Sequence, residues 1–442
     1  MSDSFQTRVR RLVADTGPTW LAGAVAAGPA TMATLLTAGA AYGYTLLWVV
    51  VLSAVLGATA QYLSARLALP ADRGIVGLVE RHLGERWAWL LVADVVLAAG
   101  LAQLVIVRTV ADVTAAVTGV DATVAGVGWA VVLAVGLAGR GYRLAEVGAK
   151  LVVSAVVVAF GASLLIVPID AGAAATGLAP SIPAGVDGAL LAAGILGGAV
   201  HVTLVTMQTY TVRARGWTER DLSLARLDVG SSMLVAFGGY SLAVFLVTAA
   251  VLGGQTELGP VSAAAALGPV AGGLAERLFL AGLLGAAVST LGGNTVVPPY
   301  LVAEKLGWGT DVSDVRYRGL LAGTALLSGL GVFVGGALFP LLALVLAFGL
   351  VGTPFALAIV LLLLADEDAP GQLTAPTAAG GAATLVVAVA TAGQFVAGHL
   401  ETATSDPISA LVVAFAVVFG LSTAVLCARV VRGGARALAA GS

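Results

Sequence analysis

Long apolar stretches dominate the chain and alternate with short polar loops. A membrane-spanning helix needs about 20 mostly apolar residues, and by that measure the pattern predicts about twelve spans. They are expected near residues 18–41, 44–68, 88–112, 122–139, 143–168, 188–212, 227–252, 275–304, 317–338, 340–365, 374–397 and 408–431. The short loops leave no room for a soluble domain. We therefore predict one transmembrane domain over residues 17–432, preceded by a segment at 1–16 and followed by a tail at 433–442.

The first apolar stretch is interrupted in its middle by Gly28, Pro29, Ala30 and Thr31. Proline lacks a backbone N–H and clashes with the carbonyl one turn earlier, so the helix must kink or unwind there. Inside a bilayer, unpaired backbone groups are tolerated only within protein or beside a wet cavity. Discontinuous helices of this kind form the midplane substrate sites of many secondary transporters. We expect a helix break at Pro29 and Ala30, with a substrate site beside it.

The sixth stretch contains a second candidate break. A glycine-rich run over 194–200 is followed by the polar residues His201 and Thr203. Two broken spans at corresponding positions of the two halves are typical of transporters built from inverted repeats.

Composition supports the membrane class and excludes several others. Hydrophobic residues make up 59% of the chain and charged residues 10%, against roughly a quarter charged in soluble domains. Cys427 is the single cysteine, which excludes an internal disulfide or a CxxC motif. The sequence has no phosphate-binding loop, no HExxH motif and no basic stretch interleaved with aromatic residues. We therefore expect that the protein is not an enzyme, needs no cofactor and binds no nucleic acid. No cleavage site follows the first apolar stretch, and we expect no removable signal peptide.

Basic residues indicate the orientation. With the N-terminus inside, all but two of the 22 Lys and Arg residues fall on the cytoplasmic side, the exceptions being Arg108 and Arg277. Basic residues are enriched in cytoplasmic loops. We predict an integral protein of a prokaryotic cell membrane with both termini in the cytoplasm.

Many short motifs resemble the NRAMP family of proton-coupled divalent-metal transporters. They run in family order along nearly the whole chain: Gly28-Pro29-Ala30-Thr31-Met32-Ala33-Thr34, Tyr42-Gly43-Tyr44, Leu46-Leu47-Trp48-Val49, Gln61-Tyr62-Leu63-Ser64-Ala65-Arg66-Leu67, Tyr142-Arg143-Leu144-Ala145-Glu146, Gly177-Leu178-Ala179-Pro180, Val302-Ala303-Glu304 and Pro354-Phe355-Ala356-Leu357. The resemblance implies an all-α fold like that of the leucine transporter, with two inverted repeats of five helices, broken helices 1 and 6, and two additional helices.

The chain departs from the family at the positions that carry its chemistry. The family's metal-binding Asp and Asn of the first helix match Gly28 and Thr31, and its Met-Pro-His motif matches residues 201–203. The tenth-helix glutamine falls near Leu346. Acidic residues of the family's proton route fall on or beside Gly100 and Gln103. By this comparison, the site lacks every family carboxylate, which points to weak or absent proton coupling.

Residues beside the two breaks are the candidate ligands. His201 could bind a transition metal or take a proton, or it could simply hydrogen-bond a neighbouring carbonyl. Thr31 and Thr203 could direct hydroxyls into the site, or bond their own backbone one turn earlier. Gly28 would contribute its carbonyl. The metal-binding hypothesis therefore rests on His201, Gly28 and Thr31.

Three further polar residues lie within predicted spans. Gln394 and Asn294 could line a substrate cavity or hydrogen-bond between helices. Asp94 is interpreted as an interfacial residue near the cytoplasmic face, the alternative being a relic of a proton route.

Three functional hypotheses follow. The first is transport of a divalent cation that keeps part of its water, such as Mg²⁺, because a neutral site compensates a bare divalent charge poorly. The second is transport of a neutral or zwitterionic organic solute by the same fold, and the third is a non-transporting scaffold or sensor. The sequence does not predict an oligomeric state.

Overall fold

The computed structural model describes residues 17–138, 142–366 and 373–440. Within these ranges the backbone is helical or in short connections, and no strand is formed. Helices satisfy all backbone groups within one segment, which hydrocarbon surroundings require. The predicted all-α class is confirmed. Residues 1–16, the predicted N-terminal segment, lie outside the described residues.

The first half contains six long or broken helices and two short ones. They are α2 (Pro18–Ala26), α3 (Pro29–Tyr42), α4 (Leu47–Ala68), α5 (Ile75–His82), α6 (Glu85–Thr118), α7 (Ala122–Ala138), α8 (Tyr142–Ile166) and α9 (Ala171–Thr176). The first helix is broken, because α2 and α3 meet at an angle of 48°.

The second half repeats this order and again begins with a divided helix. Its elements are α10 (Val186–Ala199), α11 (Val202–Ala214), η1 (Glu219–Asp221), α12 (Leu222–Val229), the π-helix η2 (Gly230–Phe237), α13 (Gly238–Leu252), α14 (Pro260–Ala263), η3 (Ala264–Leu267), α15 (Gly268–Ala271), η4 (Gly272–Leu274), α16 (Ala275–Lys305), α17 (Val315–Ser328), η5 (Gly329–Phe333) and α18 (Leu338–Ala365). Two more helices follow, α19 (Ala375–Ala397) and α20 (Pro407–Ala440).

Each of the twelve predicted segments coincides with a helix or a helix pair. Among the described residues, 8 helices are long and apolar enough to cross a membrane, or 9 if α2 and α3 form one broken span. Two of the segments that fall short have visible reasons. Helix α7 has 17 residues, and α17 has 14 and passes into the 3₁₀ turn η5. The backbone of α20 stays helical through Ala440, so the predicted tail at 433–442 continues this helix for most of its length.

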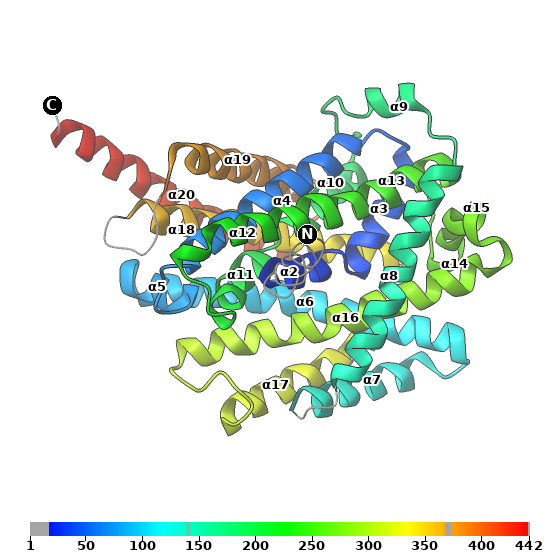
Figure 1. Cartoon of the computed structure of the whole chain (residues 1–442), viewed down its shortest axis with the longest axis horizontal. Helices are drawn as coiled ribbons and strands as arrows, with labels where there is room; N and C mark the ends of the chain where they lie inside the picture. Colours follow the sequence, from blue (N-terminus) through cyan, green and yellow to red (C-terminus); the bar gives the residue numbers. More distant parts are fainter. Residues whose placement is uncertain (1–16, 139–141, 367–372, 441–442) are drawn as a thin grey trace, which may run out of the picture.

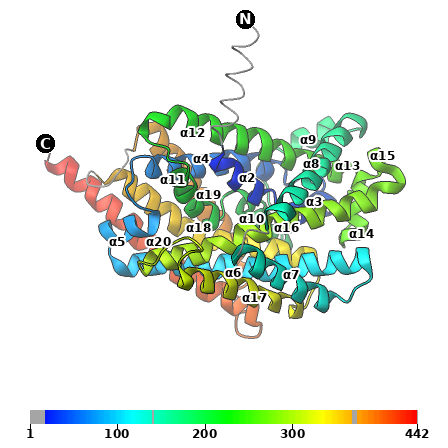
Figure 2. The same cartoon turned by 60° about the horizontal axis from the view of Figure 1, so that its bottom comes forward.

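The two halves pack around the broken helices (Figure 1). Helices α6, α7, α16 and α17 lie together on one side, and α4, α12, α13 and α19 on the other (Figures 1 and 2). Between them, α3 and α10 pack against α18. The broken helices are therefore enclosed by neighbours, as unpaired backbone groups in a membrane require.

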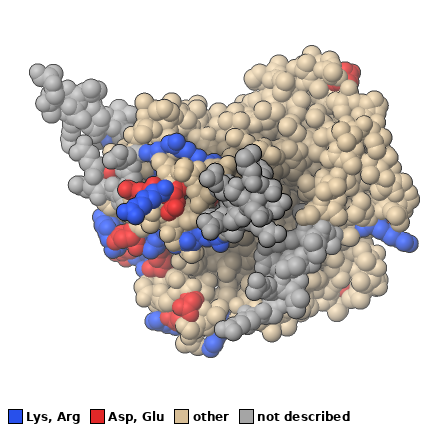
Figure 3. All heavy atoms as spheres, viewed as in Figure 1, with Lys and Arg blue, Asp and Glu red and all other residues tan. Residues whose placement is uncertain are grey.

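Charged side chains gather at one end of the molecule, where α5 and the start of α12 lie, and the described surface away from that end shows few of them (Figure 3). This distribution fits a membrane belt around the helices. Arg108 is one of the two basic residues that fall outside the predicted cytoplasmic side, and its side chain is fixed by neighbouring groups. Its guanidinium donates to the carbonyls of Val334 (2.5 Å) and Gly336 (2.7 Å) and pairs with Asp112 at 3.4 Å. It thereby caps the end of η5.

Candidate functional site

The first helix break is short. Helix α2 ends at Ala26, Gly28 is extended (φ −68°, ψ −178°), and Pro29 is the first residue of α3. Proline is well suited to that position, since the first N–H groups of a helix have no partner within it. Pro29 thus marks the break as predicted, while Ala30 and Thr31 already lie in the first turn of α3.

The second break is made by His201. Helix α10 ends at Ala199, His201 has extended backbone angles (φ −71°, ψ 140°), and α11 begins at Val202. The His201 Nδ1 accepts a hydrogen bond of 3.2 Å from the backbone N–H of Thr203. The imidazole is therefore the N-cap of α11, a role usually taken by Ser, Thr, Asp or Asn.

This geometry argues against the predicted metal-ligand role of His201 in the observed conformation. An imidazole whose Nδ1 accepts a hydrogen bond carries its proton on Nε2 when neutral, so neither nitrogen offers a lone pair. The His201 Nε2 also faces α18, where a methyl group added at Gly349 would overlap the ring. The side chain is 6% exposed, and within the described part of the chain Nε2 has no hydrogen-bond partner.

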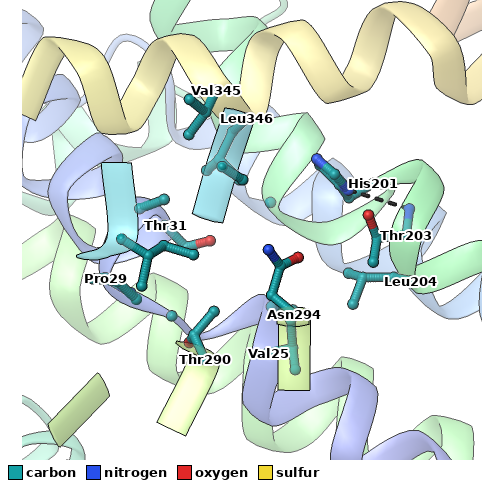
Figure 4. A pocket seen from close by; sticks show the side chains of 16 residues that line it. Val25, Pro29, Thr31, His201, Thr203, Leu204, Thr290, Asn294, Val345 and Leu346 are labelled. Atoms are coloured by element: carbon teal, nitrogen blue, oxygen red, sulfur yellow. Dashed lines mark hydrogen bonds between the residues drawn. The ribbon is translucent and has the colours of Figure 1, made fainter. Parts of the chain in front are cut away.

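A cavity of about 50 Å³ lies between the two breaks (Figure 4). Its lining comes from α2, α3, α6, α10, α11, α16 and α18: Val25, Ala26, Gly28, Pro29, Ala30, Thr31, Ala102, Ile106, Gly198, His201, Thr203, Leu204, Thr290, Asn294, Val345 and Leu346. Most of the predicted site residues are thus brought together by the fold. No carboxylate is among these lining residues.

Three threonine hydroxyls border the cavity. The Oγ1 atoms of Thr203 and Thr290 are buried and have no hydrogen-bond partner in the described structure. Thr31 makes no bond to the preceding turn, unlike Thr34 on the same helix, which donates to the carbonyl of Ala30 at 2.7 Å. Gly198 makes room for Thr31, since a Cβ there would lie 2.6 Å from its Oγ1. These hydroxyls are available as ligands.

Thr290 was missed by the sequence reasoning, although a signal existed. It precedes the predicted residue Asn294 by four positions on α16, and residues four apart share one face of a helix. A Cβ at Gly28 would lie 2.6 Å from the Thr290 Oγ1. The missing side chain of Gly28 therefore makes room for the Thr290 hydroxyl.

A hydrogen-bond relay orients Asn294, whose side chain borders the cavity in Figure 4. Its Nδ2 donates to the carbonyl of Ala99 (2.9 Å) and to the Oε1 of Gln103 (3.0 Å). The Gln103 Nε2 donates to Thr295 Oγ1 at 2.6 Å, and this hydroxyl donates to the carbonyl of Leu291. Both Nδ2 hydrogens are used on α6, so the amide oxygen is left to face the cavity as an acceptor.

Gly28 lines the cavity, and the ligand role of its carbonyl stays a prediction, although this carbonyl already has one partner. Its carbonyl accepts the first hydrogen bond of α3, from Met32 N at 3.1 Å, as the carbonyl of an N-cap residue does. The carbonyls of Ala26 and Ala27 accept no such bond across the break. Of these two residues, Ala26 lines the cavity. Its carbonyl lies at the C-terminal end of α2, where the helix dipole is negative and favours a cation.

Two polar residues of the spans lie elsewhere. Gln394 is exposed on α19 and does not reach the cavity, because α19 packs outside the ring of helices that forms the site. Asp94 is not interfacial as predicted. It is 0% exposed and abuts Gly352 of α18, and neither carboxylate oxygen has a partner among the described residues.

Side chains of α11 and the α12–η2 segment hold the start of α2. Asp228 accepts hydrogen bonds from the backbone N–H groups of Gly17 (2.8 Å) and Thr19 (2.7 Å). Gln208 donates to the Thr19 hydroxyl at 2.8 Å, and Ser232 donates to the Thr19 carbonyl at 2.8 Å. A groove of about 450 Å³ runs along α2 from Gly17 to Ala27, beside the break. Helix α2 therefore separates this groove from the cavity.

A polytopic bundle with two divided helices around a central cavity defines a membrane transporter built on discontinuous helices. The family model Nramp, "Natural resistance-associated macrophage protein-like", matches residues 19–398. The chain belongs to this family, which confirms the resemblance, and it is a transporter and not an enzyme.

Relatives and solved structures agree with this assignment. The chain is 30% identical over 293 residues to the divalent metal cation transporter MntH of Mycobacterium tuberculosis, covering 62% of this chain and 67% of that protein. It is 28% identical over 385 residues to MntH of Deinococcus radiodurans, covering 83% and 85%.

Two solved structures share the fold at low sequence identity. The Eremococcus coleocola manganese transporter superposes with a TM-score of 0.69 at 15% identity, covering 94% of this chain and 96% of that one. The nucleobase-cation-symport-1 family transporter MHP1 gives 0.57 at 16% identity, covering 94% of both chains.

Proposed function

We propose that this protein transports a divalent metal cation through the cavity between the two helix breaks. One observation carries the proposal: neutral oxygen ligands, from Thr31, Thr203, Thr290 and Asn294, converge on a small cavity at the paired breaks. Oxygen ligands suit hard cations such as Mg²⁺ and Ca²⁺. The relatives named as divalent metal cation transporters support the same substrate class.

The size of the cavity restricts how the ion is bound. A cavity of about 50 Å³ has room for a few water molecules. A fully hydrated Mg²⁺ ion, with six waters around it, does not fit into this space. The ion therefore sheds part of its water and keeps the rest. An organic solute is disfavoured, since small-molecule pockets measure roughly 300–1,000 Å³.

Weak or absent proton coupling is the second part of the proposal. The cavity lining contains no carboxylate, and His201 is engaged as the cap of α11. Within the described residues no three His, Cys, Asp or Glu side chains form a cluster that could hold a metal. Among these lining residues His201 is the one ionisable side chain, and its role as the cap of α11 leaves it poorly placed to link ion binding to proton release.

The basic residues support the proposed placement in the membrane. Residues 17–432 form the single transmembrane domain, both termini lie in the cytoplasm, and the groove along α2 leads toward that side. The membrane is that of a prokaryotic cell. The segment 433–442 lies beyond the domain.

Proteoliposomes test the proposal. Uptake of Mg²⁺, Mn²⁺, Ca²⁺ and Co²⁺ is measured with and without a pH gradient, with a pH-sensitive dye inside the vesicles. We expect saturable uptake of at least one ion that the gradient leaves unchanged. Thr290→Val and Asn294→Ala should lower the affinity for the ion, while Gln394→Ala should not. Mn²⁺-driven acidification would refute weak coupling, and uptake of no tested ion would refute the substrate class.

A further inference from the structure

A second groove lies on the outside of the bundle, away from the transport cavity. It has a volume of about 420 Å³ and runs between α4, the α12–η2 segment and α19, which lie side by side (Figure 1). Apolar residues form its walls: Val55, Ala58, Leu63, Val229, Leu234 and Pro376. Gly230 and Gly380 add no side chain and leave the space open.

The mouth of this groove is basic. The Nε of Arg226 donates to the hydroxyl of Tyr62 at 2.8 Å, and the Arg66 guanidinium donates to the same hydroxyl at 3.4 Å. Both guanidinium groups also lie over the Tyr62 ring, at 5.7 and 5.8 Å from its centre. Two positive charges thus converge on one phenol. Lys or Arg atoms are visible at the surface there, between α12 and α19 (Figure 3).

The guanidinium of Arg226 has hydrogen-bond donors that could bind a ligand. It is exposed and lines the groove. Its terminal nitrogens donate no hydrogen bond among the described residues, while its Nε is fixed on Tyr62. A guanidinium presents its donors in a planar fork that matches two phosphate oxygens. Arg66 has partners of its own and adds positive charge only.

The apolar part of the groove extends into the membrane. On α4, Val55 precedes Tyr62 by seven residues, so the wall reaches about 10 Å below the basic mouth. Its deep end is bordered by Val55 and Leu234, which are 48% and 47% exposed and so face lipid. A ligand that fills this groove must have an anionic head at the level of Arg226 and an apolar chain beneath it.

We propose that this groove is a binding site for one anionic phospholipid of the leaflet on the basic side of the protein. The phosphate is held by Arg226 beside Tyr62, and the upper part of one acyl chain lies between α4 and α19. Basic pockets between helices on the cytoplasmic side are a known way in which proteins bind acidic headgroups. Neither a free anion nor a neutral lipid matches both parts of the groove.

Native mass spectrometry of the delipidated full-length protein tests this site. The protein is titrated with phosphatidylglycerol and, separately, with phosphatidylcholine of the same chains. We expect preferential binding of phosphatidylglycerol. Arg226→Gln should weaken it about fivefold, the value of one basic residue near an anionic headgroup, and leave phosphatidylcholine unchanged. Arg226→Lys should keep part of the preference.

Matched variants separate the site from general effects. Gly380→Leu fills the groove without a change of charge and should also weaken phosphatidylglycerol binding. Ala382→Leu, an exposed position of α19 two residues from Gly380 and so on the opposite face of the helix, and Arg220→Gln, an exposed arginine of η1, should bind as wild type. Binding by Arg226→Gln at the wild-type level would overturn the proposal. So would displacement of the lipid by millimolar inorganic phosphate, which would show that a free anion is the occupant.

Discussion

The carboxylate of Asp228 is expected to control the position of α2. It is fully buried and accepts two short hydrogen bonds from the first N–H groups of that helix, those of Gly17 and Thr19. Hydrogen bonds to charged groups contribute about 1.5–3 kcal/mol each. In Asp228→Asn, one oxygen remains as an acceptor and the amide N–H₂ faces a second donor. One bond is lost, and the start of α2 is weakened by about 2 kcal/mol.

A loss of this size has a measurable consequence. Since 1.4 kcal/mol is a factor of ten, displacement of α2 from α12 should become roughly 30-fold more frequent. The reporter is Ala26→Cys, which is 3% exposed, in a Cys427→Ser background. In inside-out vesicles, a membrane-impermeant maleimide should label this cysteine faster when Asp228→Asn is present. Asp314→Asn, at the N-cap of α17, is the matched control.

The reasoning would be refuted by one clear result. If Asp228→Asn is folded, as judged by gel filtration and thermal melting, and labels at the background rate, Asp228 does not hold α2 against opening.

Four shorter predictions follow from the site and its surroundings. His201→Ser, which keeps a capping oxygen, should retain ion uptake, while His201→Ala loses a cap of about 1 kcal/mol and should lower it; loss of ion binding in both would indicate a metal ligand. Gln103→Leu removes the acceptor that orients Asn294 and should raise the KM for ion uptake about tenfold; an unchanged KM would contradict the relay. Asp94→Asn should leave ion uptake as in wild type, both with and without a pH gradient, and slower uptake by the variant under either condition would show that Asp94 takes part in transport. The Arg81 guanidinium, by its hydrogen bond, lowers the pKa of Asp72 in the exposed loop before α5, so the pair stabilises the fold above the ordinary aspartate pKa of about 4. That contribution is lost as the pH falls through the lowered pKa, and melting of Asp72→Asn against wild type from pH 6 to 3 should show a difference of at most about 0.5 kcal/mol.

The sequence predicted the fold well because membrane helices obey a local rule. Each spanning segment must be apolar over its whole length, and the twelve segments read from the chain all coincide with helices. Pro29 predicted the first helix break because proline lacks a backbone N–H. The polar residue His201, which follows a glycine-rich run, predicted the second. The ends of helices α7 and α17 were harder to predict. They depend on turns such as η5, whose end is capped by Arg108 of another helix.

Most of the residues predicted for the site line one cavity, but the contacts of their side chains were not predicted. Thr31, Thr203 and Asn294 reach the cavity, whereas Gln394 does not, because a sequence shows that a helix is polar at one point but not which neighbour it faces. Asp94 is buried against Gly352 for the same reason.

By itself, the sequence determined that this is a polytopic membrane protein with paired helix breaks and no carboxylate at residues 28–31 and 201–203. These properties depend on residue type and on spacing along one chain. Only the tertiary structure decided which atoms are free to bind. Thr290 enters the cavity because Gly28 has no side chain, Asn294 presents its oxygen because Gln103 takes its hydrogens, and His201 is occupied as a cap. Each outcome depends on a contact between helices that lie far apart in the sequence or on a hydrogen bond that the fold alone creates.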